Sequence, residues 1–188
     1  MPAMSVLADS KKLEQLVRRL GDEVAQAMQA GGPWAFVGIR SRGDVLARKL
    51  AVMLQPQHFG SVDIALYRDD LSEVGPQPIV RTTDVNFPLD GTSILLVDDV
   101  LMTGRSVRAA IQSLIDFGRP RCIRLLVLVD RGGRELPITP DFVGLRVDAE
   151  RDQLVDVRLK PFDDTDAIVM ADRDESAAAA ALEGGQPE

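Results

Sequence analysis

Two adjacent acidic residues and a short polar turn lie close together in the middle of the chain. Asp98 and Asp99 directly follow residues 93–97, an apolar run typical of a strand that is buried on both faces. Ligands of open parallel sheets bind beyond the carboxyl ends of the strands, where carboxylates can accept hydrogen bonds from sugar hydroxyls. Further on, Thr103-Gly104-Arg105-Ser106 opens a predicted helix, and free N–H groups with two hydroxyls form an anion site there. This spacing predicts a ribose 5-phosphate unit as the ligand.

Each of these two features also has a purely structural interpretation. Acid pairs at strand ends and Thr-Gly turns at helix starts are both common without a function, so only their combination is specific. The chain contains neither a Gly-x-x-x-x-Gly-Lys loop nor a Gly-x-Gly-x-x-Gly fingerprint. A Walker-type nucleotide site and a dinucleotide site are therefore not predicted.

Alternating strands and helices must position these residues. Apolar spacing predicts helices at 10–30, 44–54 and 105–117, strands at 34–39, 62–67, 93–97 and 123–129, and weaker strands near 142–147, 154–159 and 167–170. This order predicts an α/β fold with an open, mostly parallel sheet flanked by helices on both faces. Residues 68–90 are charged, rich in proline and without periodicity, and loops of this length are often functional lids.

Composition and charge exclude several classes of protein. The 188 residues are 45% hydrophobic and 27% charged, which is typical of a globular chain, and no run is long enough to span a membrane. No signal peptide is expected at the N-terminus, and the single cysteine and single histidine exclude an internal disulfide and Cys- or His-rich metal sites. A reducing, cytoplasmic setting is expected. The net charge of −7 resides in residues 163–188, which carry eight acids and one base, so the body is neutral.

Four segments, in the right order, resemble the type I phosphoribosyltransferases. Val97 through Ser106 resembles the phosphoribosyl pyrophosphate (PRPP) motif of that family. The segments that are similar to its PyrR group are Val37 through Gly43, Leu66 through Leu71, Asp99 through Arg105, and Val129 through Gly132 together with Arg134 through Ile138. The resemblance covers roughly residues 10–170. It implies a Rossmann-like α/β fold with a small hood and a mobile lid loop, in a single domain at 1–170 followed by an acidic, disordered tail at 171–188.

The resemblance also implies a reaction. PyrR proteins convert uracil and PRPP to uridine monophosphate (UMP) and pyrophosphate, with Mg²⁺ bound chiefly through PRPP. Asp98 and Asp99 would bind the ribose hydroxyls and face the positive charge that develops on the sugar. The 5-phosphate would lie in the PRPP site formed by Asp98, Asp99, Val100, Leu101, Met102, Thr103, Gly104, Arg105 and Ser106. Pyrophosphate would lie against Arg40, Ser41, Arg42 and Gly43.

Further site residues follow from the same resemblance. Arg68 and Arg81 would neutralise phosphates as the lid closes, and uracil would lie against Asp130, Arg131 and the backbone of Val155. Some purine-using relatives carry an acid at the position of Met102, so an apolar residue there makes a purine substrate less favoured.

Three functions stay open at this point. The chain is an enzyme, an RNA-binding regulator gated by UMP with little or no catalysis, or a nucleotide sensor that has lost both activities. The complete aspartate pair, phosphate turn and loop 40–43 favour the enzyme. Many PyrR proteins also bind the leader RNA of pyrimidine operons, and we expect this binding to be weak or absent here. Arginines that could form a basic face are Arg18, Arg19, Arg134, Arg146, Arg151 and Arg158, but the body has no net positive charge. A homo-oligomer, dimeric or higher, is expected.

Overall fold

A five-stranded parallel sheet forms the centre of the computed structural model, which describes residues 4–64, 83–150 and 152–172. Its strand order is β3-β2-β4-β5-β6. The strands are β2 (Trp34–Ile39), β3 (His58–Val62), β4 (Ser93–Leu101), β5 (Cys122–Asp130) and β6 (Phe142–Arg146). All four pairings between neighbours are parallel, which confirms the predicted α/β sheet. From β2 the next strand, β3, is added on one side of the sheet, whereas from β4 the next strands, β5 and β6, are added on the other side. Sheets of this kind bind ligands at the carboxyl ends of the strands where the order reverses, which here is between β2 and β4.

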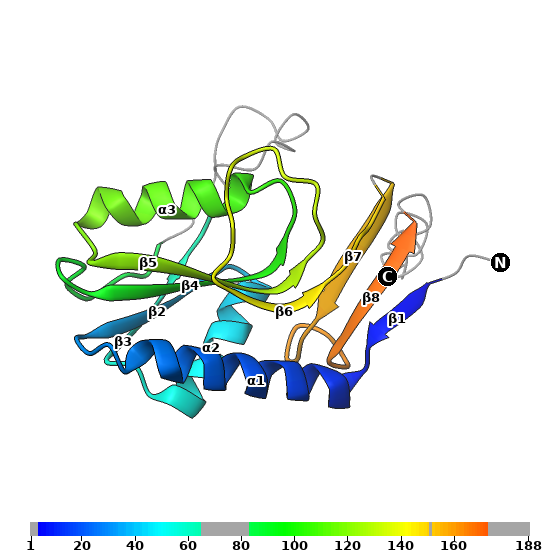
Figure 1. The fold of residues 1–188 in the computed structure, drawn as a ribbon, viewed down its shortest axis with the longest axis horizontal. Coiled ribbons are helices and arrows are strands. Elements are labelled where there is room, and N and C mark those ends of the chain that lie inside the picture. The colour runs from blue at the N-terminus through cyan, green and yellow to red at the C-terminus, as the bar shows by residue number, and fades with distance from the viewer. Residues whose placement is uncertain (1–3, 65–82, 151, 173–188) are drawn as a thin grey trace, which may run out of the picture.

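Helices cover both faces of this sheet (Figure 1). Helices α1 (Ser10–Met28) and α2 (Arg42–Leu54) lie on one face and α3 (Arg105–Phe117) lies on the other. Helix α1 begins where the Asp9 carboxylate accepts a hydrogen bond from the Lys12 N–H at 2.8 Å, and its apolar residues recur every three or four positions. Burying these helix faces against the sheet creates two apolar cores, one on each side.

A second, smaller sheet forms the expected hood. It consists of β1 (Ser5–Ala8), β7 (Gln153–Arg158) and β8 (Ala167–Asp172) in the antiparallel order β1-β8-β7. Figure 1 shows it standing beside the carboxyl ends of the parallel strands, with α1 running from the hood to below the central sheet. None of the helices in the described parts of the chain is long and apolar enough to cross a membrane.

Several strands differ from the sequence-based prediction. Strand β4 was expected to end at residue 97, but it continues to Leu101 because Asp98 and Val100 still pair with Val127 and Val129 of the long strand β5. Strand β3 was expected at 62–67 but lies at His58–Val62, in register with β2. Strand β1 was not predicted, since four residues are too short to show a period. Strand β8 continues to Asp172, and residues 173–188, the rest of the expected tail, lie outside the described residues.

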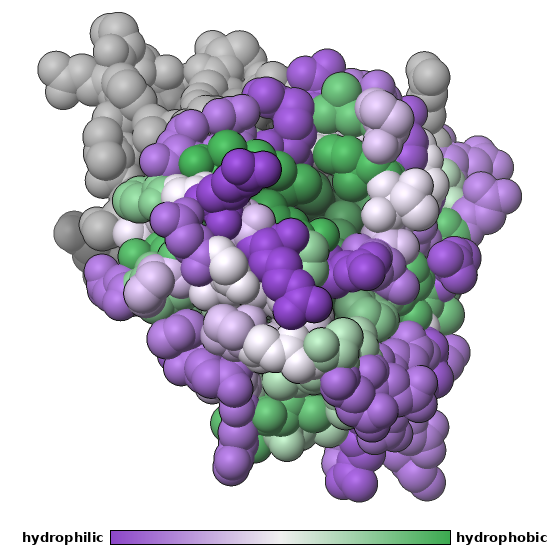
Figure 2. Space-filling view, turned by 60° about the vertical axis from the view of Figure 1, so that its left-hand side comes forward, coloured by the Kyte–Doolittle hydropathy of each residue, from purple (hydrophilic) through white to green (hydrophobic). Residues whose placement is uncertain are grey.

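The opposite end of the molecule carries a different surface. Figure 2 brings forward the side where the parallel strands begin, and shows an apolar hollow rimmed by hydrophilic side chains. A pocket at this end, between the end of α3 and the start of β5, is lined by Ile115, Gly118, Arg119, Pro120, Cys122 and Ile123. It contains none of the predicted site residues.

Candidate functional site

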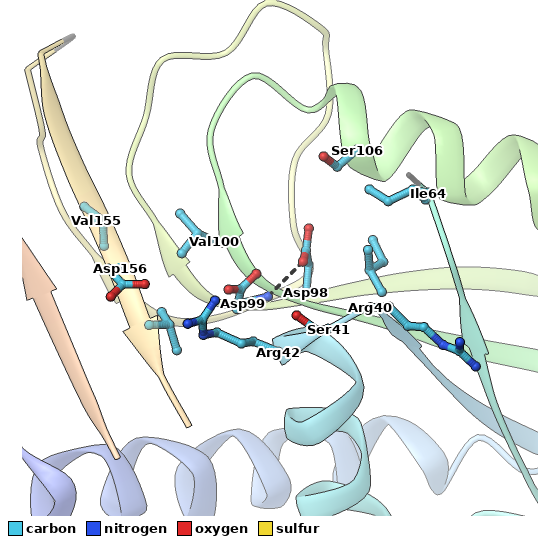
Figure 3. Close-up of a pocket in the computed structure, with 12 residues that line it drawn as sticks. Arg40, Ser41, Arg42, Ile64, Asp98, Asp99, Val100, Ser106, Val155 and Asp156 are labelled. Carbon is cyan, nitrogen blue, oxygen red and sulfur yellow. Dashed lines mark hydrogen bonds between the residues drawn. The ribbon is translucent and has the colours of Figure 1, made fainter. Parts of the chain in front are cut away.

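A polar pocket of about 230 Å³ lies between the carboxyl ends of β2 and β4 and the hood strand β7. It is lined by Ile39, Arg40, Ser41, Arg42, Ile64, Asp98, Asp99, Val100, Ser106, Val155, Asp156 and Val157 (Figure 3). The structure thus brings together residues from three predicted parts of the site, namely 40–43, 98–106 and Val155, although more than 100 positions separate the first from the last. Ile39, Ile64, Asp156 and Val157 were not among the predicted site residues.

The aspartate pair occupies the floor of this pocket. Both residues belong to β4, so their backbones are fixed by the sheet rather than by a loop. Asp98 is buried and its Oδ1 accepts a hydrogen bond from the N–H of Asp99 at 3.0 Å, while Asp99 is half-buried. Two carboxylates held side by side on a rigid strand can accept hydrogen bonds from neighbouring hydroxyls and oppose a positive charge above them.

Two helix N-termini face the same pocket. Ser41 and Arg42 begin α2, and Ser106 lies in the first turn of α3. Ser41 makes no side-chain capping hydrogen bond, and at the start of α3 the Thr103 hydroxyl accepts a hydrogen bond from the Arg105 N–H at 3.3 Å. The first N–H groups of a helix carry a partial positive charge and lack partners within the helix. The pocket therefore offers two anion sites on either side of a carboxylate pair, which is the arrangement that a sugar carrying phosphates at both ends requires.

Two glycines allow these helix starts to lie so close to the sheet. A Cβ atom on Gly43 would lie 2.6 Å from the carbonyl oxygen of Val97 and 3.1 Å from the Cα of Asp98. Gly104 adopts a φ of +90°, a left-handed conformation that favours glycine, and a Cβ there would lie 3.2 Å from Ile138. Gly43 does not line the pocket. It lies behind the pocket, where the absence of a side chain allows α2 to pack closely against β4, the strand that carries Asp98 and Asp99.

The two arginines of the loop 40–43 point in different directions. Arg40 donates from Nε to the Oγ of Ser61 at 3.1 Å, and Figure 3 shows its guanidinium extending away from the aspartates. Arg42 instead reaches toward Asp99 and Asp156 (Figure 3). Its Nε and Nη2 donate to the two carboxylate oxygens of Asp163 at 3.1 and 3.0 Å. The peptide bond between Arg40 and Ser41 is cis. Of the two guanidiniums, only that of Arg42 is directed to the pocket.

Of the three residues predicted to bind uracil, one lines the pocket and two do not. Val155 lines the pocket, whereas Asp130 and Arg131 do not. Arg131 is buried, with its Nη2 donating to the carbonyl oxygen of Glu150 at 2.8 Å. Asp130 Oδ1 accepts hydrogen bonds from the N–H of Gly132 at 3.1 Å and from Arg134 Nη2 at 2.6 Å. Both side chains therefore hold the loop that follows β5, and their contact with a base stays a prediction.

Arg134 joins that loop to the phosphate turn. Besides Asp130, its guanidinium donates to the carbonyl oxygens of Met102 at 2.9 Å and Ile138 at 3.0 Å. The carbonyl oxygen of Thr103 accepts from two N–H groups of the same loop, and Arg105 pairs with Glu135 at 2.7 Å. Arg134, expected to lie on a basic face, is thus half-buried in a network that supports residues 101–105. Arg68 and Arg81, the predicted lid arginines, lie outside the described residues.

Ion pairing lowers the pKa of two carboxyl groups at the edge of the site. The hydrogen bonds from Arg42 lower the pKa of Asp163 from its ordinary 3.8, with burial opposing them and the Leu159 N–H assisting. Burial opposes the ionisation of Asp166 too, but the Lys160 N–H and Lys49 outweigh it, and its pKa is also lowered. A carboxyl whose pKa is lowered by folding stabilises the native state above its unfolded pKa, and this contribution is lost as the pH falls through the native pKa.

We expect Asp163→Asn to destabilise the protein more at pH 7 than at pH 2.5. The free energy of unfolding should differ between the two proteins above pH 5, and the difference should shrink as the pH falls below 3.8. This difference in the free energy of unfolding is measured by urea unfolding, which is monitored through the fluorescence of the single tryptophan, Trp34. A difference that is the same at both pH values would mean that the charge of Asp163 does not contribute to stability.

Comparisons with known proteins identify the family and the fold. Residues 4–160 match the family model described as the phosphoribosyl transferase domain. Among solved structures, the hypoxanthine phosphoribosyltransferase of Trypanosoma cruzi superposes with a TM-score of 0.70 over 95% of each chain, at 14% identity. That of Staphylococcus aureus has a TM-score of 0.66 over 87% of this chain and 90% of its own, at 19% identity. These two similarities show the fold.

The chain therefore belongs to the phosphoribosyltransferases. Within them it belongs to the PyrR family. The chain is 40% identical to the bifunctional protein PyrR of Elusimicrobium minutum, over 88% of this chain and 95% of that protein. It is 43% identical to the bifunctional protein PyrR of Thermus thermophilus, over 89% of this chain and 96% of that protein.

Proposed function

We propose that this chain is a uracil phosphoribosyltransferase, which converts uracil and PRPP to UMP and pyrophosphate. The observation that carries the proposal is the carboxylate pair of Asp98 and Asp99 between two helix N-termini in one pocket. PRPP has a phosphate at one end of the ribose, a pyrophosphate at the other and two hydroxyls between them. The pocket offers complementary groups in the same order.

Each part of the pocket then has one task. The N-terminus of α3, with Thr103 to Ser106, holds the 5-phosphate, and the N-terminus of α2 with Arg42 holds the pyrophosphate. Asp98 and Asp99 accept hydrogen bonds from the ribose hydroxyls. As pyrophosphate leaves, positive charge develops on the sugar, and the two carboxylates stabilise that charge more strongly than they stabilise the neutral ribose.

The donor groups at the pocket also fit Mg²⁺ bound together with PRPP. Magnesium prefers oxygen ligands and commonly takes one or two from protein carboxylates and the rest from phosphates and water. Asp98 and Asp99 supply such oxygens, and within the described residues there is no group of three or more His, Cys, Asp or Glu that could hold a metal by itself. Bound in this way, Mg²⁺ neutralises charge on the pyrophosphate.

Uracil is placed at the hood side of the pocket. Val155 lines the pocket there, and it belongs to β7, which is an edge strand of the hood sheet. Met102 contributes an apolar side chain to the nearby loop, where a Cβ on Gly133 would lie 3.5 Å from its Cγ. Asp130 and Arg131 support this side of the site through the loop that follows β5.

The direct test is an assay of the purified full chain. We expect UMP to form from uracil, PRPP and MgCl₂, and the corresponding nucleotide to form far more slowly with hypoxanthine or guanine in place of uracil. No UMP between pH 6 and 9, with the protein folded, would overturn the proposal.

A second activity is suggested by the word bifunctional in the names of the relatives. The pairing of the candidate RNA-binding arginines argues that binding to RNA is weak here. Arg18 pairs with Glu14 and Arg19 with Glu23, both at 2.7 Å, and Arg158 pairs with Asp156 at 3.1 Å. These carboxylates compete with RNA phosphates for the same guanidinium groups.

We expect the protein to bind hairpin RNA no more tightly than about micromolar at physiological salt, in the usual non-specific range. Titration of its own pyrimidine-operon leader RNA between 50 and 200 mM salt, with and without UMP, measures this affinity. Binding at nanomolar concentration that UMP enhances would show that the regulatory function is present. Arg18→Ala is the informative variant, because its side chain is 71% exposed. Arg134→Ala is not, since it would also disturb the phosphate turn.

A further inference from the structure

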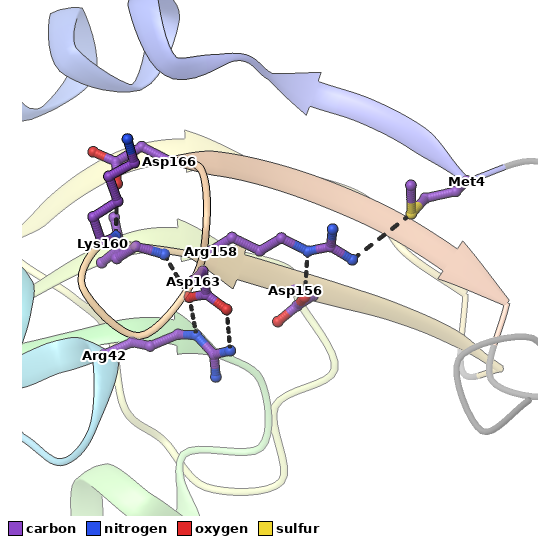
Figure 4. A network of polar contacts seen from close by, with 8 residues as sticks. Met4, Arg42, Asp156, Arg158, Lys160, Asp163 and Asp166 are labelled. Carbon is purple, nitrogen blue, oxygen red and sulfur yellow. Dashed lines mark hydrogen bonds and ion pairs between the residues drawn. The ribbon is translucent and has the colours of Figure 1, made fainter. Parts of the chain in front are cut away.

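The loop between β7 and β8 is fastened to α2 by two ion pairs (Figure 4). Asp163 pairs with Arg42 at 3.0 Å and Asp166 pairs with Lys49 at 2.7 Å. Each carboxylate also accepts a backbone N–H of its own loop, from Leu159 at 2.7 Å and from Lys160 at 2.8 Å respectively. The two aspartates thus stabilise the conformation of their own loop, and they also bind two positively charged side chains of α2. Only one of those cations, Arg42, lines the pocket.

The contact between Arg42 and Asp163 fixes the direction of the guanidinium. It joins two donors, Nε and Nη2, to two acceptor oxygens, and such forked pairs define the orientation of the planar group. The side chain of Asp163 is only 16% exposed and that of Arg42 is 32% exposed, so water screens this pair less than it screens surface pairs.

Arg42 keeps donors for a second partner. A guanidinium has five N–H groups, and the fork with Asp163 occupies one edge of it. The other edge, formed by Nη1 and the second hydrogen of Nη2, is left for another acceptor. Figure 3 shows the guanidinium on the pocket side, directed toward Asp99 and Asp156. Asp163 therefore holds one edge from behind while the guanidinium lines the pocket.

We propose that Asp163 is a positioning residue for pyrophosphate binding, which holds Arg42 so that its remaining donors meet the pyrophosphate of PRPP. The proposal rests on the proposed function of the pocket. Asp163 itself does not line the pocket, so it acts through Arg42. A free arginine side chain loses considerable rotamer freedom when it binds an anion, whereas a side chain already held in place loses less. The hood loop in this way contributes to substrate affinity from outside the pocket.

Asp166 provides a matched control for Asp163. It lies in the same loop, pairs with the same helix and accepts one backbone N–H, but its partner Lys49 does not line the pocket. Asp163→Asn and Asp166→Asn therefore remove comparable structural contacts, and only the first releases a pocket residue. If the loop acted merely as a packing element, the two variants would have similar kinetics.

The test compares steady-state kinetics of the wild type and both variants. A charge-assisted hydrogen bond contributes about 1.5–3 kcal/mol, and tenfold in affinity corresponds to 1.4 kcal/mol. We expect Asp163→Asn to raise the KM for PRPP about tenfold with kcat nearly unchanged, because Arg42 would bind pyrophosphate equally before and during reaction. The KM for uracil should not change. Asp166→Asn should stay within about twofold of the wild type for both constants.

Two further variants keep the test decisive. In an Arg42→Ala background, Asp163→Asn should change the KM for PRPP by less than about twofold, since its effect requires Arg42. Asp163→Glu keeps the carboxylate and should recover part of the affinity. Asp163→Ala also removes the carboxylate and replaces Asp163→Asn should that variant not fold.

The outcomes separate this proposal from the proposed function. A wild type that forms no UMP would overturn the function of the pocket. The role of Asp163 alone would be overturned by an active wild type whose Asp163→Asn variant behaves like Asp166→Asn. The same conclusion would follow if Asp163→Asn cost as much affinity in the Arg42→Ala background as it does in the wild type.

Discussion

Replacing Asp98 or Asp99 by asparagine is expected to lower the turnover number about 100- to 1,000-fold, the usual cost of removing one preorganised electrostatic group. Asparagine keeps the size of the side chain but removes its charge. In the ground state the ribose hydroxyls need only a hydrogen-bond acceptor, which the amide oxygen still supplies. In the transition state the sugar carries positive charge, which only the carboxylate opposes. The affinity for UMP should therefore fall far less than kcat.

Stopped assays with saturating PRPP and uracil, together with calorimetric titration of UMP, measure the two quantities. Asp116→Asn is the matched control, because Asp116 is exposed near the end of α3, where it accepts a hydrogen bond from Gln112, and it does not line the pocket. Thermal unfolding of each variant checks the fold, which matters most for Asp98 because it is buried. Unaltered turnover in both pocket variants would contradict the electrostatic mechanism.

The sequence predicted the central fold well because its signals are local. The helix starts and the buried runs of β2, β4 and β5 follow from periodicity and from apolar residues at adjacent positions. The end of β4 could not be predicted in this way. Asp98 and Asp99 are polar, and they remain in the strand because the partner strand β5 continues to Asp130 beside them. Pairing between strands is a tertiary property, and no local pattern records it.

The same distinction separates the predicted from the unpredicted site residues. Residues 98–106 form a short continuous motif whose composition and spacing predict a ligand site. Residues 40–43 were assigned to the site through the resemblance to the phosphoribosyltransferases. The pair between Arg42 and Asp163 joins residues 121 positions apart, and Asp163 lies in an acidic stretch that is typical of a solvated turn. Asp156 is the one acidic residue of β7, between two valines. Only the folded hood shows that it borders the pocket.

Arg134 illustrates the opposite error. Its position in a polar, arginine-containing loop made it a candidate for an exposed basic face. In the structure its guanidinium is half-buried among backbone carbonyl oxygens of two loops, where it satisfies acceptors that water would otherwise have to reach. A charged residue in a loop can thus hold neighbouring loops together, and the residue type alone does not predict whether its side chain is exposed.

Replacing Gly43 by alanine is expected to lower both stability and turnover. The added Cβ would lie 2.6 Å from the carbonyl oxygen of Val97 and 3.1 Å from the Cα of Asp98, and both are backbone atoms of β4 that cannot rotate away. Helix α2 must then move off the strand, at a cost of about 1–3 kcal/mol for overpacking. The move separates the start of α2 from the aspartates, and a misplacement of about 1 Å can lower turnover roughly 100-fold.

Gly21→Ala is the matched control for this prediction. A Cβ on Gly21 meets only the end of the Met53 side chain, at 2.8 Å from Cε, and that flexible thioether can move. Because alanine also favours a helix interior by about 1 kcal/mol over glycine, Gly21→Ala should keep wild-type turnover and lose little or no stability. Urea unfolding and kcat measured on both variants test the contrast. If Gly43→Ala retained wild-type stability and turnover, the close approach of α2 to the aspartate strand would not be what positions the pyrophosphate side of the pocket.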